Sequence, residues 1–211
     1  DWTPLSYISK YMSLAIRTTE DPGFWAHRGF SIKAIEDSIA DNIRAGRFAR
    51  GASTVTMQLA KNLWLYRQKT LARKLQELIL TMYLEQSLSK EQILELYLNI
   101  VELGPDVYGI GQASLHYFNT IPTTLSISQA VFLATILPHP VGIYFGQDKK
   151  LSPGRLAYVR RIIQLMFERK LISEEEYKEG MEEEPIFGSQ KPQREGEAFT
   201  YTKGIDPSDW N

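Results

Sequence analysis

The 211-residue chain contains no cysteine, and this absence removes several kinds of chemistry. No disulfide framework can staple the fold, and no thiolate is available as a metal ligand or a nucleophile. The absence fits a reducing or an oxidising compartment equally well, so it gives no information about location. Because 43% of the residues are hydrophobic, the chain can build a substantial core without such staples.

An excess of charge of one sign is also lacking. With 24 basic and 25 acidic residues the formal net charge is −1, so the whole molecule has no general attraction for nucleic acid or an anionic membrane. We therefore expect no nucleic-acid partner. The charges are nevertheless distributed unevenly, because eight Lys or Arg residues and no Asp or Glu occur from Arg44 to Lys74.

A long stretch without charge runs from Val107 to Gln147. Its length would suffice to cross a bilayer, but Pro122, Pro138 and Pro140 interrupt it and polar residues are scattered through it. We interpret it as buried core. The sequence has no signal peptide and begins at Asp1, so we expect it to be a piece of a longer chain whose membrane anchor lies elsewhere.

Apolar residues recur with helical spacing almost throughout, and no alternating run is long enough for a confident strand. The sequence therefore predicts a mainly α fold. One expected helix begins at Ser31 and ends near Gly46, and a second covers residues 70–87 and buries Leu71, Leu75, Leu78 and Met82. A third covers residues 91–98 after a capping box of Ser89 and Gln92. Two more run from Ser128 to Leu137 and from Pro153 to Arg169, and a last, short helix is capped by Ser173 and Glu176.

Periodicity fades from Pro185 onward, where Gly, Pro, Ser and charged residues dominate. We therefore expect one domain over residues 1–184 and an extended tail or linker over residues 185–211. Because this tail has little apolar content, its removal is expected to leave the fold intact.

The first segment with chemical potential covers residues 20–29. Glu20 and Asp21 are adjacent carboxylates, followed by aromatic residues and His27 in a turn rich in Pro and Gly. A carboxyl group at a helix end beside apolar side chains loses solvation, which raises its pKa and suits it to act as a general base. In the alternative interpretation, Glu20 and Asp21 cap the next turn and His27 is a satisfied core residue.

The second segment covers residues 51–62, where a loop of small residues leads into a helix. Backbone N–H groups and hydroxyls at such a helix start can bind an anion, and Lys61 could add a positive charge. The segment lacks the spacing of the nucleotide-binding phosphate loop. The alternative is that Ser53 and Thr54 are helix caps and that Lys61 belongs to a solvated face.

The third segment contains Arg73, Lys74 and Glu77, whose spacing places two cations and a carboxylate on one helix face, opposite Leu75 and Met82. Surface pairs at this spacing are common and weak, so the alternative is a solvated face.

The fourth segment, residues 90–118, contains a glycine pair, Gly109 and Gly111, that permits close backbone approach; we interpret most of it as scaffold. Three histidines without the H-E-x-x-H spacing argue against a catalytic zinc site.

In this order the four segments resemble the motifs of glycosyltransferase family 51, which comprises the peptidoglycan glycosyltransferase domain of class A penicillin-binding proteins and the monofunctional transglycosylases. The resemblance covers about residues 15–140. It implies a mainly α, lysozyme-like lobe and a smaller, membrane-facing jaw formed by about residues 36–50.

The resemblance also implies roles for individual residues. Glu20 matches the glutamate that removes the proton from the acceptor sugar 4-hydroxyl, Asp21 a supporting carboxylate, and Glu77 the second essential glutamate, near the donor. The residues that fall where the family holds the donor pyrophosphate and the nearby sugar are Ser53, Thr54, Gln58, Lys61, Asn62, Lys69, Arg73 and Lys74.

The implied reaction is the polymerisation of lipid II into β-1,4-linked glycan, with inversion and release of undecaprenyl pyrophosphate. The resemblance implies no required cofactor, although a divalent cation, Mg²⁺ or Mn²⁺, assists at the pyrophosphate in some members, and no metal ligand is assigned. The implied partners are lipid II, the growing glycan chain and the inner-membrane surface, with penicillin-binding proteins and division or elongation proteins as candidates. The implied location is the periplasmic face of the bacterial inner membrane.

The sequence departs from the family pattern at Ser31, Met57 and Gln76, and none of these changes removes a catalytic carboxylate. Two alternatives stay open. A lysozyme-like lytic transglycosylase would cleave glycan but would have no use for cations placed at a pyrophosphate. A non-catalytic lipid- or glycan-binding module would have no need to retain both Glu20 and Glu77.

Overall fold

The computed structural model describes residues 2–30, 36, 44, 53–64, 71–140, 150–185 and 187–188. Most of the helix expected from Ser31 to Gly46, most of the proposed jaw and Lys69 lie outside the described residues. No helix within these ranges is long and apolar enough to cross a membrane.

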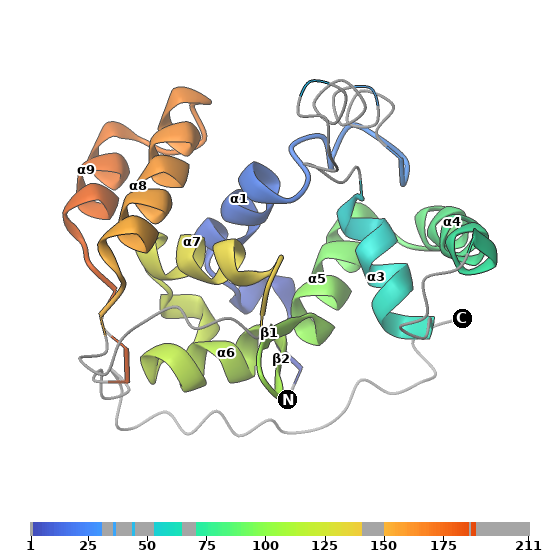
Figure 1. The fold of residues 1–211 in the computed structure, drawn as a ribbon, viewed down its shortest axis with the longest axis horizontal. Coiled ribbons are helices and arrows are strands. Elements are labelled where there is room, and N and C mark those ends of the chain that lie inside the picture. The colour runs from blue at the N-terminus through green and yellow to red at the C-terminus, as the bar shows by residue number, and fades with distance from the viewer. Residues whose placement is uncertain are drawn as a thin grey trace.

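The fold is mainly α, as the periodicity predicts (Figure 1). The α-helices of the described ranges are α1 (Lys10–Thr19), α3 (Val55–Trp64), α4 (Leu71–Ser87), α5 (Lys90–Ile100), α6 (Gly109–Phe118), α7 (Ile127–Ile136), α8 (Pro153–Glu168) and α9 (Glu174–Glu182). Two short 3-10 helices cover Leu5–Tyr7 and Pro122–Thr124, and β1 (Glu102–Gly104) pairs antiparallel with β2 (Val107–Tyr108). Strands this short leave no detectable alternation in the sequence, which is why none was expected.

Among the predicted helix starts that fall on described residues, only that of α7 is wrong. Capping boxes begin α5 at Ser89 and α9 at Ser173, and Pro153 occupies the first turn of α8. The start of α7 was predicted wrongly, because Ser126 rather than Ser128 makes the capping box. Ser128 is buried inside the helix, where its hydroxyl donates to the backbone oxygen of Gly180 at 3.0 Å.

Helix α7 forms the centre of the core. All ten of its residues are buried, and it packs against α1, α8 and α9 (Figure 1). The interpretation of the uncharged stretch as core is therefore confirmed for this helix. A helix without any polar face can be accommodated only where neighbours surround it.

Helix α4 has the predicted length but buries the opposite side. Leu75 and Met82 are 55% and 51% exposed, whereas Glu77, Thr81 and Leu84 are buried. The predicted apolar stripe is thus wrong at Leu75 and Met82. The buried positions follow helical spacing and face α3, so a charged side chain takes the inward position.

Helix α6 was not predicted, since two glycines near its start weaken the helical pattern. Gly109 has a φ of +77° and lies against the backbone of Asn99, so that a side chain there would collide with it. Close backbone approach at this glycine was expected and is confirmed. It lets α6 start directly after the β1–β2 hairpin.

The packed molecule continues past the predicted domain end. Phe187 is 3% exposed and packs its ring against Phe118 and Phe132, and the Gly188 N–H donates to the Tyr117 carbonyl at 2.8 Å. The beginning of the expected tail is therefore packed on the fold at Phe187, and the effect of removing the tail stays a prediction. One large aromatic side chain supplies the anchor that overall composition concealed.

Candidate active site

Glu20 lies at the C-terminal end of α1, where its N–H still donates to the Ile16 carbonyl at 2.9 Å. Its Oε2 accepts a hydrogen bond from Gln58 Nε2 at 2.9 Å. Burial raises the pKa of the Glu20 carboxyl above its ordinary value; the Gln58 hydrogen bond opposes this shift, nearby Asp21 adds to it and Lys61 opposes it. This direction agrees with the shift expected at this helix end, and the role of Glu20 as base stays a prediction.

Asp21 is buried and accepts hydrogen bonds from two neighbouring groups. His27 Nε2 donates to its two carboxylate oxygens, at 2.8 Å and 3.1 Å, and the Val55 N–H donates to Oδ2 at 3.1 Å. The second bond places a carboxylate at the start of α3, where the helix dipole favours negative charge. The structure therefore gives Asp21 a capping and positioning role, and its direct part in catalysis stays a prediction.

Thr54 also fixes the start of α3. Its hydroxyl donates to the Gly29 carbonyl at 2.6 Å and accepts from the Met57 N–H at 3.2 Å, while Ser53 beside it is exposed. The alternative interpretation of Thr54 as a helix cap is confirmed. Its contact with substrate, like that of Ser53, stays a prediction.

Gln58 connects the base to a residue that the sequence did not single out. The Tyr97 hydroxyl, on α5, donates to Gln58 Oε1 at 3.1 Å, so that Tyr97, Gln58 and Glu20 form a chain of hydrogen bonds. Tyr97 has no exposed surface. The only available signal was that a tyrosine in an apolar helix needs a partner for its hydroxyl when buried.

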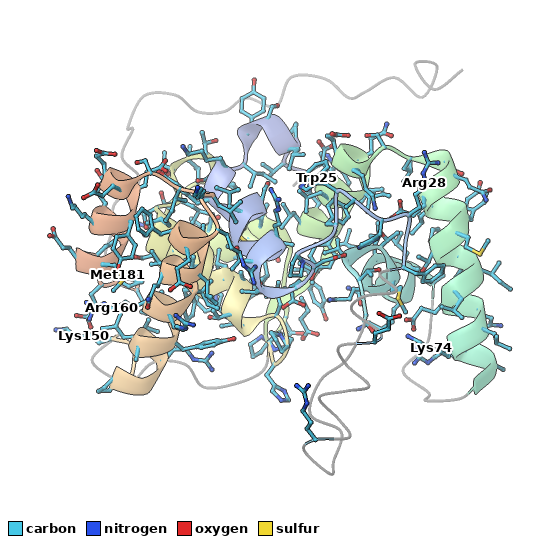
Figure 2. All side chains as sticks on the ribbon, turned by 90° about the horizontal axis from the view of Figure 1, so that it is seen from above. Trp25, Arg28, Lys74, Lys150, Arg160 and Met181 are labelled. Carbon is cyan, nitrogen blue, oxygen red and sulfur yellow. The ribbon has the colours of Figure 1, made fainter. Side chains whose placement is uncertain are left out.

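The cationic cluster on α4 consists of two cations, Arg73 and Lys74, and the carboxylate that holds both of them, Glu77. Arg73 Nη1 lies 3.2 Å from Glu77 Oε2, and Lys74 Nζ lies 2.5 Å from Glu77 Oε1. The side chain of Glu77 is only 4% exposed while that of Lys74 is 41% exposed, so the alternative of a solvated face is wrong for the carboxylate. In Figure 2, Lys74 lies on the side of α4 that faces the rest of the molecule.

Helix α3 joins the base to this cluster. It carries Gln58 toward Glu20 and packs against both α4 and α5 (Figure 1). Lys61, one turn beyond Gln58, is exposed but close enough to influence the Glu20 carboxyl, and Asn62 is exposed beside it. The structure thus brings Glu20, Asp21, Gln58 and Lys61 together, with Arg73, Lys74 and Glu77 on the adjoining helix.

Among the described residues, no group of three or more His, Asp or Glu side chains is placed to hold a metal ion. Glu77, the carboxylate beside Arg73 and Lys74, is engaged by both cations. We therefore do not assign Glu77 as a metal ligand.

Comparison with known proteins supports the motif assignment. The profile of the transglycosylase family matches residues 1–164. The chain is similar to proteins named biosynthetic peptidoglycan transglycosylase: 41% identical over 162 residues in Nitrosomonas eutropha, covering 77% of this chain and 65% of that one, and 45% identical over 161 residues in Citrobacter koseri, covering 76% and 66%. The chain thus spans about two thirds of the length of these relatives.

A crystal structure of penicillin-binding protein 1A from Haemophilus influenzae superposes with a TM-score of 0.40 at 23% identity, covering 65% of this chain and 17% of that one. A superposition this partial defines no shared architecture, so the assignment depends on the sequence comparisons. The chain belongs to the transglycosylase family, glycosyltransferase family 51.

Proposed function

We propose that this chain polymerises lipid II into β-1,4-linked glycan at the periplasmic face of the bacterial inner membrane. The observation that carries the proposal is the pairing of a desolvated carboxylate, Glu20, with a cationic cluster on an adjoining helix. The first suits proton removal and the second suits a phosphate-bearing leaving group. The proposal includes a lysozyme-like lobe and a jaw within residues 36–50.

Glu20 acts as the general base. The acceptor 4-hydroxyl becomes nucleophilic as its proton passes to the Glu20 carboxylate, and its oxygen attacks the donor sugar on the face opposite the leaving pyrophosphate. The configuration inverts in this single displacement, so no covalent nucleophile of the chain is needed. A positioned general base contributes a rate factor of roughly 10²–10⁴ and acts best when its pKa lies near the working pH.

Arg73, Lys74 and Lys61 stabilise the departing pyrophosphate. Negative charge grows on its oxygens as the glycosidic bond breaks, and fixed cations compensate it without rearranging at that moment. Glu77 holds Arg73 and Lys74 in place before the donor binds. A divalent cation at the pyrophosphate would take its ligands mainly from phosphate oxygens, and none of the steps proposed here requires one.

The exposed apolar side of α4 supports a position against a lipid surface. Leu75, Ile79, Met82 and Tyr83 are each more than half exposed and recur with helical spacing on a helix whose inward side carries the cationic cluster. A substrate with a polyprenyl tail stays in the bilayer, so an apolar surface beside the pyrophosphate site would bring the protein to it.

The rival functions fit these features less well. A glycan-cleaving enzyme protonates a sugar leaving group and has no use for the cationic cluster, and a binding module has no use for a carboxylate with a raised pKa. The geometry therefore favours glycan synthesis over both.

The deciding experiment is polymerisation of labelled lipid-linked disaccharide-pentapeptide in detergent by the wild type and by Glu20→Gln. The variant keeps the size of the side chain and removes the base, so we expect its rate to fall by roughly 10²–10⁴. Glu168→Gln, which changes an exposed glutamate on α8, is the matched control and should keep full activity.

A well-folded wild type that makes no glycan would refute the proposed function. Full activity in Glu20→Gln would leave the function standing but remove the base. Cleavage of purified glycan without synthesis would favour the lytic alternative.

A further inference from the structure

We propose that Tyr97 is a positioning residue for the base, because its hydroxyl fixes the Gln58 amide with the N–H side toward Glu20. This inference deepens the proposed function and rests on Glu20 being the base. It adds to the machinery a residue on α5 that would never touch substrate.

The three side chains come from three different elements. Glu20 ends α1, Gln58 lies in the first half of α3, and Tyr97 lies on the inward side of α5. The hydroxyl of Tyr97 is 3.1 Å from Gln58 Oε1, and Gln58 Nε2 is 2.9 Å from Glu20 Oε2. Gln58 therefore bridges a buried phenol and the reactive carboxylate.

The single proton of the Tyr97 hydroxyl sets the direction of these two hydrogen bonds. Within the described residues, Gln58 Oε1 is the only hydrogen-bond acceptor that the structure gives to the Tyr97 hydroxyl. A buried hydroxyl that fails to donate loses a hydrogen bond it would have made in water. If the amide turned over, its NH₂ would face the phenol and the phenol proton would have no acceptor.

The charged groups around Glu20 influence the pKa values of both Glu20 and Tyr97. Among the described residues, Asp21 from the loop after α1 raises the pKa of Glu20 and Lys61 from α3 lowers it, while Asp21 itself is engaged by His27. Burial, followed by the charges of Glu20 and Asp21, raises the pKa of Tyr97 well above its ordinary value. The phenol thus keeps its proton over the whole range in which Glu20 titrates.

The consequence concerns the form of Glu20 that can act as base. An amide N–H donates a stronger hydrogen bond to an ionised carboxylate than to the neutral acid and so favours the ionised form, whereas an amide oxygen would accept the proton of the neutral acid and favour that form. By preventing the second arrangement, Tyr97 limits how far burial can raise the pKa of Glu20. The base then stays ionised at a lower pH than its burial alone would allow.

The test is the pH profile of kcat/KM for Tyr97→Phe. Activity depends on ionised Glu20, so a higher pKa moves the acidic limb to higher pH. We expect a shift of up to about one pH unit, with most of the activity recovered at high pH. Tyr117→Phe, which removes another buried hydroxyl that donates to a backbone carbonyl, is the matched control and should leave the limb in place.

A second measurement separates this inference from the proposed function. A ¹³C titration of the Glu20 carboxyl in the full chain, with its signal assigned by Glu20→Gln, reports the pKa without catalysis. We expect a higher pKa in Tyr97→Phe even if the polymerisation assay fails. An unchanged pKa, or an activity loss equal at every pH, would overturn the inference.

A double variant tests whether Tyr97 acts through Gln58. Gln58→Met removes the donor, so it should raise the Glu20 pKa by itself, and adding Tyr97→Phe should then change the pKa no further. If the two shifts simply add, Tyr97 acts by another route and the inference is wrong. When Tyr97→Phe is poorly folded, Gln58→Met alone still tests the Gln58 step, and an unchanged Glu20 pKa in that variant would overturn the inference.

Discussion

Glu77 is buried and Glu20 is partly buried, but the surroundings of the two carboxylates differ in kind. Glu20 faces a neutral amide donor and loses solvation, which raises its pKa, whereas Glu77 is held by Arg73 and Lys74 through two ion pairs. Environments that differ in this way can give two carboxylates two roles. Glu20 is the one suited to take a proton, and Glu77 the one suited to hold cations in place.

The residue-scale prediction concerns Lys61. We expect Lys61→Ala to lower polymerisation by about 10²-fold, since it removes a cation from the proposed pyrophosphate site. Gln76→Lys, on the exposed surface of α4, only adds a surface charge and should change the rate by less than about threefold. The measurement is the initial rate of glycan synthesis for both variants, and equally small effects would contradict the pyrophosphate assignment.

At the scale of elements, α3 carries most of the organisation of the site. Its start is fixed by Asp21 and Thr54, its first turns present Gln58 to the base, and its sides pack on α4 and α5. A displacement of this one helix would disturb the base and the cationic cluster together. Gly29, with a φ of +86° and with Thr81 of α4 packed against it, holds the loop that Thr54 anchors.

The element-scale prediction concerns the exposed apolar side of α4. Ile79 is 67% exposed, so Ile79→Glu should change the free energy of unfolding by no more than about 0.5 kcal/mol. The charge should nevertheless lower binding to vesicles of phosphatidylethanolamine and phosphatidylglycerol several-fold in a sedimentation assay. Gln86→Glu adds the same charge to an exposed polar position of α4, and equal losses in both variants would show that apolar contact is not involved.

At the scale of the whole molecule, side chains from distant parts of the sequence tie the described termini to the core. Glu95 on α5 accepts hydrogen bonds from Trp2 Nε1 at 2.9 Å and from the Leu5 N–H at 2.7 Å. Near the other end, Glu176 on α9 accepts from the Tyr11 hydroxyl of α1 at 3.0 Å. In Figure 2, Arg160 of α8 and Met181 of α9 lie far from Lys74 of α4, at the other end of the described part of the molecule.

The prediction at this scale concerns where the packed molecule ends. Phe187→Ala should lower the free energy of unfolding by about 3 kcal/mol or more, because it empties a site among aromatic rings. For a chain of this size that corresponds to a fall in Tm of roughly 10 °C. A chain ending at Gly188 should keep the Tm of the full chain, whereas one ending at Glu184 should lose as much as Phe187→Ala. Equal Tm values for the two shortened chains would contradict this prediction.

Sequence alone determined the mainly α class, most helix starts and the motifs around Glu20, Gln58 and Glu77, because capping, periodicity and motif spacing are local properties. The inward side of α4 was decided only by tertiary structure, since packing against α3 overrode the apolar pattern that Leu75 and Met82 suggested. The same holds for Phe187, whose partners lie more than fifty residues away in the sequence.

The difference between what the sequence determines and what the tertiary structure decides is clearest at Glu20, the proposed general base. The sequence indicated that Glu20 could lose solvation at a helix end, a conclusion that needs only its neighbours in the chain. It did not indicate the partner of Tyr97, because the hydrogen bond from Tyr97 to Gln58 spans 39 residues and exists only once α5 packs on α3. Which groups surround a buried carboxyl, and hence its pKa, depends on contacts between elements that local sequence patterns do not encode.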